Sequence, residues 1–223
     1  MSARDSILGK IRASMGSPAS NDDRRQAVLD RLADTPTGII PGRAKLPKAE
    51  QVELFCEMAE QFGATLARVS TYGEVAGEVS GYLRARNLPA AIRMGADERL
   101  KKAGWETEKN LELRHGLSDG GDLAGVSHAT AGIAETGTVA MMSGQDNPTT
   151  INFLPEHHIV VIKAADIKGD MESVWAMVRK KQGKGEMPRA LNLITGPSRS
   201  GDIEQTILLG AHGPRALHVI VVE

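Results

Sequence analysis

The chain has 223 residues, of which 41% are hydrophobic and 25% charged, a balance that is typical of a folded globular protein and excludes a disordered one. Its formal net charge of -1 gives no overall field that would attract nucleic acid or an anionic membrane. The few aromatic residues (three Phe, two Trp and two Tyr) also argue against a protein that stacks single-stranded bases.

The single cysteine, Cys56, excludes an intrachain disulfide, a zinc ribbon and a four-cysteine iron–sulfur cluster in this chain. Its apolar neighbours at helical spacing favour a small buried hydrophobe over a nucleophile. No run approaches the roughly 20 apolar residues of a membrane helix, and the N-terminal segment lacks the continuous apolar core of a signal peptide. We therefore expect a cytoplasmic protein with no membrane span and no metal site.

Two short, highly charged helices are predicted before the main domain, over residues 2–15 and 21–33. A Pro- and Gly-rich connector follows, and the main domain is expected to begin near residue 45. The predicted organisation is a helical arm with its connector over 1–44 and an α/β domain over 45–223.

Helical periodicity and short apolar runs alternate through the main domain. The predicted helices cover 48–63, 74–86, 96–105 and 170–181, and the predicted strands cover 66–70, 90–95, 109–116, 158–167 and 217–222. This alternation implies a largely parallel sheet with right-handed crossovers.

The segment 121–144 combines small residues with an acid at a break. Val126 could end a strand, and the alanines at 129, 131 and 134 predict a short helix punctuated by Gly132. Glu135, Thr136 and Gly137 then form a sharp turn into a strand over 138–142. Close packing and ligand contact both account for the small residues. The position of Glu135 is the unexplained feature.

The stretch Leu191–Pro214 predicts a buried strand, a Gly-Pro turn and a helix over 202–209. Backbone N–H groups at the start of such a helix, with the hydroxyls of Ser198 and Ser200, could hold an anion. Asp202 and Glu204 would repel a phosphate there, so an acid-capped helix and a mixed polar site around Arg199 both remain open.

Histidines offer weaker signals. His212 follows the predicted helix and could cap it or act as a general acid or base. His157 and His158 are adjacent on a predicted strand, so their side chains point to opposite faces and would not chelate a metal together. The basic cluster over 179–184 is explained by a solvated helix C-terminus. No nucleophile-elbow, zincin, Walker or dinucleotide-binding pattern occurs.

Four segments carry a resemblance to a known family. AETGTVAM (134–141), LPEHHIVVI (154–162), LITGPSRSGDIEQTILLGAHGP (193–214) and the terminal LHVIVVE resemble the lactate utilization protein C family, which carries the LUD domain. The resemblance covers roughly residues 50–223. It implies a Rossmann-like α/β fold, a mostly parallel sheet flanked by helices, similar to ribose-phosphate isomerases, glucosamine-phosphate deaminases and CoA transferases.

The same resemblance implies a function for the chain and the positions of its candidate site residues. The family acts with two partner proteins that carry iron–sulfur centres and supports oxidation of L-lactate to pyruvate. Candidate ligand-binding positions that match its blocks are Glu135, Thr136, Gly137, Thr138, Gly196, Ser198, Arg199, Asp202, Glu204 and His212, with Glu135 and His212 as catalytic candidates. Glu135 also sits in a setting similar to that of the catalytic glutamate of CoA transferases. The segment 143–153 departs from the family in having fewer basic residues.

Three hypotheses follow. The first is an accessory or assembly subunit of a cytoplasmic lactate-oxidising system whose iron–sulfur clusters lie in its partners, so that this chain holds no cofactor. The second is a stand-alone small-molecule enzyme or sensor that binds an organic anion in a pocket like that of CoA transferases. The third is a structural α/β module whose turn motifs serve packing only.

Overall fold

The structure is a computed structural model that describes residues 3–14, 21–34, 36–183, 185–203 and 206–223. The chain divides into two compact units, residues 1–38 and 39–223. The first unit holds two helices, α1 (Ala3–Ser14) and α2 (Asn21–Ala33), as the sequence predicts. Where the main domain begins relative to residue 45 stays a prediction.

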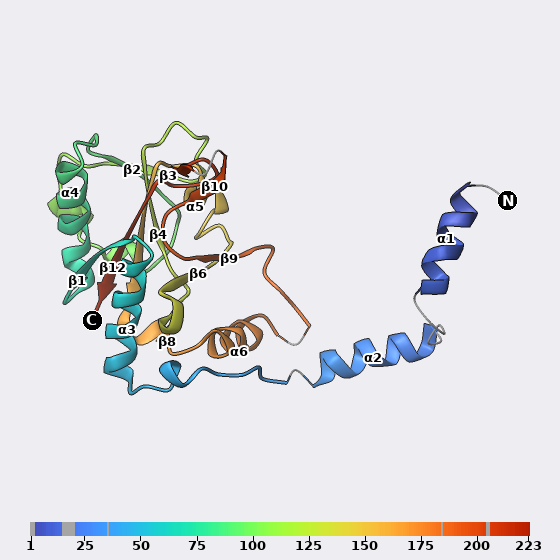
Figure 1. Ribbon diagram of the computed structural model, residues 1–223. Coiled ribbons are helices and arrows are strands. Elements are labelled where there is room, and N and C mark those ends of the chain that lie inside the picture. Colours follow the sequence, from blue (N-terminus) through green and yellow to red (C-terminus); the bar gives the residue numbers. More distant parts are fainter. Residues whose placement is uncertain (1–2, 15–20, 35, 184, 204–205) are drawn as a thin grey trace. The chain divides into compact units, whose positions relative to one another are not determined.

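The second unit is built on a six-stranded parallel sheet in the order β1-β12-β7-β4-β2-β3 (Figure 1). Its strands are β1 (Thr65–Val69), β2 (Ala91–Met94), β3 (Glu112–His115), β4 (Ala124–His128), β7 (His157–Lys163) and β12 (Ala216–Val222). The predicted α/β class with a mostly parallel sheet is confirmed.

Helices cover both faces of this sheet. α3 (Lys48–Gln61) shares a core with Val160 and Ile162 of β7, whereas α4 (Val75–Ala85) shares one with Ile159 and Val161. Successive residues of a strand point to opposite faces, so the unbroken apolar run of β7 fills two cores at once. Such a run is the expected signature of a central parallel strand.

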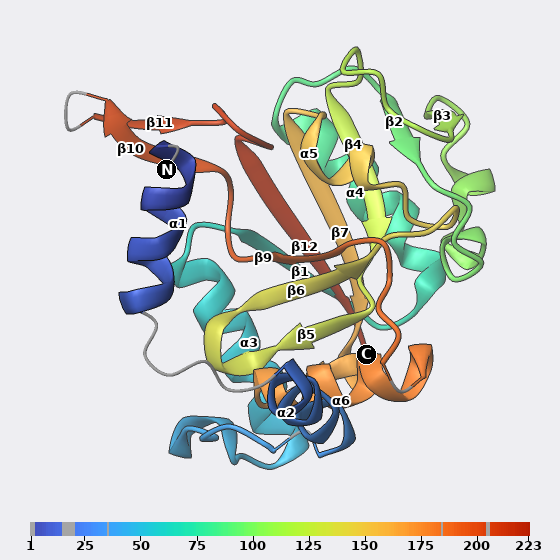
Figure 2. The ribbon, with the colours of Figure 1, turned by 90° about the vertical axis from the view of Figure 1, so that its right-hand side faces the viewer.

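A second sheet of four strands has the order β8-β5-β6-β9 and lies in front of the parallel sheet in Figure 2. Its strands are β8 (Ile167–Lys168), β5 (Ala131–Ile133), β6 (Thr138–Met142) and β9 (Leu191–Ile194). Only the β5–β8 pair is parallel. α6 (Met171–Gln182) packs on this sheet through Val174 and Val178.

The short helix predicted around Gly132 is wrong, because β5 occupies that place. A Cβ at Gly132 would come within 3.1 Å of Ile162, Phe55 and Ile167. The small residues therefore let a strand approach the core, and this tertiary packing overrides the helical propensity of alanine. The sharp turn that follows is confirmed, with Gly137 at a φ of 62°.

The helix predicted over 202–209 is also wrong. Strands β10 (Arg199–Ile203) and β11 (Thr206–Leu209) form an antiparallel hairpin instead. A segment of eight residues is too short to be stable as a helix by itself, and its β-branched Ile203, Thr206 and Ile207 favour strands. Glu204 lies outside the described residues.

Two further differences concern shorter elements. The helix predicted over 96–105 is replaced by two 3-10 turns, Leu100–Lys102 and Trp105–Thr107. The segment around residue 150, for which no helix is predicted, contains α5 (Thr149–Phe153). No described helix has both the length and the apolar character needed to cross a bilayer.

Candidate functional site

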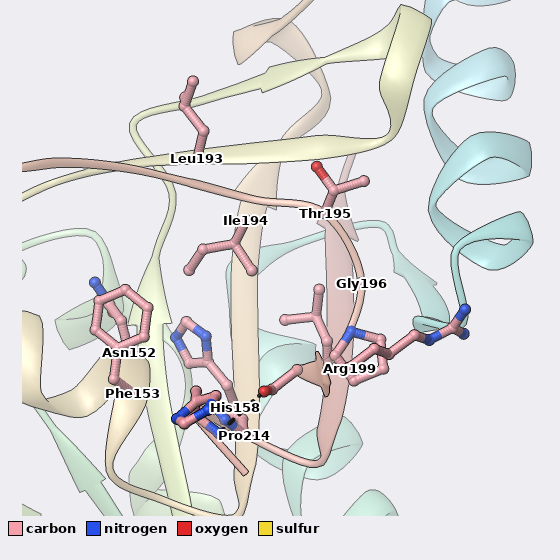
Figure 3. Close-up of a pocket in the computed structure, with 14 residues that line it drawn as sticks. Asn152, Phe153, His158, Leu193, Ile194, Thr195, Gly196, Arg199 and Pro214 are labelled. Carbon is pink, nitrogen blue, oxygen red and sulfur yellow. Dashed lines mark hydrogen bonds between the residues drawn. The ribbon is translucent and has the colours of Figure 1, made fainter. Parts of the chain in front are cut away.

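A cavity of about 310 Å³ lies beneath the turn at Gly196 and Pro197 (Figure 3). This turn belongs to the family-like block, residues 193–214, and we call the cavity the signature cavity. Its walls come from α5, the turn after β9, the segment before β12, and the first residues of β7 and β12. They consist of Asn152, Phe153, His158, Leu193, Ile194, Thr195, Gly196, Pro197, Ser198, Arg199, His212, Gly213, Pro214 and Leu217. The cavity therefore lies at the amino ends of the parallel strands, although the turn follows the carboxyl end of β9.

Four of the predicted ligand-binding residues line this cavity: Gly196, Ser198, Arg199 and His212. The Ser198 N–H donates to Pro214 O over 2.8 Å, and the Gly210 N–H donates to Ser198 O over 3.0 Å. The Ser198 hydroxyl accepts from the His212 N–H over 3.4 Å. Hydrogen bonds thus join the turn around Ser198 to the segment 210–214 of the same block. Because no helix precedes His212, the predicted helix-capping role is wrong.

The Glu135–Thr138 turn does not line the cavity. Glu135 Oε1 accepts from the Met171 N–H over 2.9 Å and so binds the start of α6. The hydroxyl of Thr138 is 2.6 Å from that of Thr195, which does line the cavity. A hydroxyl–hydroxyl contact of 2.7 Å joins Thr136 to Thr138.

Gly137 supports the packing of this turn, since a Cβ there would collide with the backbone of Ala59 in α3. The turn therefore lies outside the cavity and contacts its lining through the hydrogen bond between Thr138 and Thr195. A catalytic role for Glu135 stays a prediction, as does one for His212.

Arg199 contributes to the cavity wall, but its guanidinium points away from the cavity towards the end of α3 (Figure 3). A Cβ added to Gly63, which follows α3 at a φ of 89°, would collide with Nη2 of Arg199. Glycine at 63 thus leaves space for the arginine. Asp202 lies in β10, and its side chain is not among the described ones. The mixed polar site around Arg199 therefore stays a prediction.

Three polar side chains that the sequence did not connect form a network at the cavity wall. His158 Nε2 is 3.1 Å from Ser127 Oγ, and Ser127 Oγ is 3.1 Å from Asn152 Oδ1. An amide oxygen only accepts, so the single serine proton is donated to Asn152. The His158 Nε2–H must then donate to Ser127, which leaves Nδ1 of the neutral ring as a bare acceptor.

Burial lowers the pKa of His158 to about 3, so the ring is neutral at physiological pH. His158 Nδ1 and Asn152 Nδ2 are both buried, and neither has a hydrogen-bond partner among the described residues. Leaving a buried polar group unpaired costs about 1–3 kcal/mol. The residues that carry this free acceptor and this free donor both line the signature cavity, which makes them candidates for contact with a ligand.

Three of the other histidines have structural partners. His157 and His158 lie on opposite faces of β7, as predicted, and His157 Nδ1 is 2.9 Å from the Tyr82 hydroxyl. His128 and His218 bond to Tyr72 and Thr65. Among the described residues no group of three or more His, Cys, Asp or Glu could hold a metal ion.

The interpretation of Cys56 as a structural residue agrees with its surroundings. The residue is half-buried, and burial raises the pKa of its thiol to about 11. A thiol with this pKa is almost fully protonated at neutral pH, and the thiolate is the nucleophilic form. Cys56 is therefore a poor nucleophile.

The family model of the LUD domain matches residues 20–222. The chain belongs to the LUD domain family. It is 33% identical over 175 residues to a lactate utilization protein C of Geobacillus kaustophilus, covering 74% of this chain and 70% of that protein. It is 36% identical over 101 residues to the protein of the same name from Geobacillus sp. strain WCH70, covering 44% of this chain and 42% of the relative.

A third relative spans the whole chain. An uncharacterized protein of Neisseria meningitidis serogroup B is 28% identical over 238 residues, which cover 100% of this chain and 94% of the relative. The solved structure of a DUF162 family protein from Deinococcus radiodurans superposes with a TM-score of 0.56 at 24% identity, covering 80% of this chain and 99% of that one. This similarity supports the fold.

Proposed function

We propose that this protein takes part in lactate utilization and that its signature cavity binds a small 2-hydroxy acid. The single observation that carries the proposal is the unpaired acceptor and donor, His158 Nδ1 and Asn152 Nδ2, beside one cavity. Several relatives bear the name lactate utilization protein C, and this supports the choice of lactate among the hydroxy acids.

A hydroxyl group satisfies both atoms at once, because it donates its proton to His158 and accepts from the amide of Asn152. A keto oxygen can only accept, and it would leave His158 Nδ1 unpaired. We therefore expect L-lactate to bind more tightly than pyruvate. Apolar walls from Phe153, Ile194 and Leu217 suit the methyl group of lactate.

We further propose that the chain is an accessory or assembly subunit of a cytoplasmic system that oxidises L-lactate to pyruvate. Electron transfer is assigned to iron–sulfur partners, since one half-buried cysteine cannot hold a cluster. The signature cavity would then present or retain substrate, and no cofactor is assigned to this chain.

Calorimetric titration of the purified full chain with L-lactate and pyruvate tests the ligand. In His158→Gln the amide nitrogen replaces Nε2 as a donor to Ser127, while the Nδ1 acceptor is lost. We expect lactate affinity to fall about three- to tenfold, the effect of one lost hydrogen bond. His157→Gln, the neighbouring residue on the other face of the sheet, is the matched control. Equal affinities in the two variants would refute the assignment.

Native co-purification, followed by lactate-dependent dye reduction with and without this chain, tests the setting. Recovery of iron–sulfur proteins with lost dye reduction in its absence supports the accessory role. Lactate binding by the isolated chain, with no such partners recovered, supports the stand-alone alternative instead. Unchanged complementation by a His158→Gln/Asn152→Leu double variant would favour a purely structural module.

A further inference from the structure

A second cavity, of about 240 Å³, lies where the connections of the parallel sheet change direction. From β2 the chain moves to β3 at one edge, whereas from β4 it moves through β7 to β12 in the opposite direction. β2 and β4 are neighbours, with Met94 paired to Val126. Asp97 follows the carboxyl end of β2, and His128 ends β4. Open α/β sheets bind ligands at this point, so we call it the switch-point cavity.

A buried ion pair forms one side of this cavity. Asp97 is only 4% exposed, and its Oδ1 accepts from both the N–H and the Nε–H of Arg99 over 2.9 Å. Arg99 Nη2 donates to Asp97 Oδ2 over 2.6 Å, and Nη1 donates to Ala129 O over 3.3 Å. A guanidinium carries five N–H groups, so two remain for a ligand.

The wall behind the ion pair is uncharged. His128 Nδ1 is 2.7 Å from the oxygen of Ala129, a bond in which the ring nitrogen must donate. Its Nε2 is 2.8 Å from the Tyr72 hydroxyl. Burial, reinforced by the charge of Arg99, lowers the pKa of His128 to about 4. The positive charge on this side therefore comes from Arg99.

Two further residues of the lining offer acceptors. The Asn147 amide is oriented by its Nδ2, which donates to Met142 O over 3.0 Å. Its Oδ1 is buried and has no partner among the residues that the structure describes. Asp146, the residue before Asn147, also lines the cavity and adds a carboxylate. Both groups call for an N–H or O–H donor.

Lys181 of α6 completes the lining, and no salt bridge of its ammonium group is found among the described residues. The lining thus carries two positive groups, Arg99 and Lys181, and two negative ones, Asp97 and Asp146. Asp97 and Arg99 neutralise each other, which leaves the Lys181 ammonium group, the Asp146 carboxylate and the two free N–H groups of Arg99 for a ligand. A zwitterion matches this pattern better than a simple anion.

We propose that the switch-point cavity binds a small α-amino acid, with its carboxylate towards Arg99 and Lys181 and its ammonium group towards Asn147 Oδ1 and Asp146. This site is separate from the signature cavity and does not depend on the proposed function. L-alanine and L-lactate are nearly the same size and differ at the α-substituent, an ammonium group in one and a hydroxyl in the other. The ammonium group can donate to Asn147 and Asp146 and carries the opposite charge to the carboxylate.

Titration of the 15N-labelled full chain with L-alanine, L-serine, L-lactate and acetate, each followed by two-dimensional NMR, tests the assignment. We expect the amino acids to shift the side-chain amide signal of Asn147 saturably at millimolar concentration, and to do so more strongly than acetate or lactate. Lys181→Gln should weaken this binding about threefold, as expected for an exposed ion pair. Lys180→Gln, one position away on α6 and outside the cavity lining, should leave it unchanged.

Two results would overturn the assignment. One is an Asn147 signal that no amino acid shifts, and the other is an equal response to acetate, which would show a simple anion site. Lactate binding at Asn152, with no response of Asn147 to either amino acid, would leave the proposed function intact while refuting the amino-acid site.

Discussion

The two cavities lie at opposite ends of the strands of one parallel sheet, the signature cavity at the start of β7 and β12 and the switch-point cavity at the end of β2 and β4, and they differ in the groups that line them. The signature cavity leaves one neutral acceptor and one neutral donor, on residues that are 0–1% exposed. The switch-point cavity has one such neutral acceptor, Asn147 Oδ1, and in addition charged groups nearer to solvent, since the Arg99 side chain is 39% exposed. Directional hydrogen bonds inside a dry wall select a functional group, whereas partly solvated charges select a charge pattern and are weakened by salt.

The largest expected effect is the pH dependence of the free energy of unfolding, to which the buried histidines of both cavities contribute. The pKa values of His158, His128 and His218 are about 3, about 4 and about 4 in the folded chain, below their ordinary 6.5. The folded state then binds fewer protons than the unfolded state below pH 6.5. Stability is complete above that value and falls as the pH decreases towards 4, by up to about 1.4 kcal/mol per pH unit for each histidine.

Urea unfolding between pH 5 and 8 measures this slope. His158→Gln should remove less than one third of it, because His158 is one of three buried histidines and the lowered pKa of His157 adds to the same slope. An unchanged slope in that variant would contradict the assignment of a buried neutral His158.

The ion pair of the switch-point cavity gives the next effect. Arg99→Gln leaves the carboxylate of Asp97 buried without its partner, and we expect a loss of about 3 kcal/mol in the free energy of unfolding. Asp97→Asn combined with Arg99→Gln should recover most of this loss, since no charge is then left unpaired. A single variant as stable as the parent would show that solvent already screens the pair.

Asn152→Leu tests the signature cavity, and we expect it to change lactate affinity with little change in stability. The substitution removes an unpaired buried donor and also an acceptor for Ser127, so the two effects on stability offset each other to within about 1 kcal/mol. Lactate affinity should nevertheless fall about tenfold. Calorimetry and urea unfolding on one preparation measure both quantities. A strongly destabilised variant with unchanged lactate affinity would assign Asn152 to packing.

Arg199→Ala gives the smallest expected effect. Its guanidinium lies against Gly63, outside the cavity, so lactate affinity should change less than about twofold, which is less than the loss of one hydrogen bond. If affinity is abolished, Arg199 must turn inward when ligand binds.

Local patterns predicted most of the parallel sheet and its helices, because unbroken apolar runs and helical periodicity survive packing. They failed where small or β-branched residues leave the choice to tertiary contacts, as in β5 and the β10–β11 hairpin. The hairpin shows the ambiguity well, since Ile203, Ile207 and Leu208 fit a helical face as readily as a strand.

The site was predicted in outline only. The family-like block located the signature cavity, but Ser127, Asn152 and His158 become neighbours through the pairing of β4 with β7 and the packing of α5. No spacing in the sequence joins them. Asp97 had a usable signal that was missed, because it is an acid just after a predicted strand, where carboxyl ends of parallel strands gather binding groups.

A crystal structure of the full chain with L-lactate tests the central claim most directly. We expect lactate in the signature cavity, with its hydroxyl oxygen within about 2.7–3.2 Å of both His158 Nδ1 and Asn152 Nδ2. Lactate bound in the switch-point cavity, or a signature cavity that holds water at saturating lactate, would contradict it.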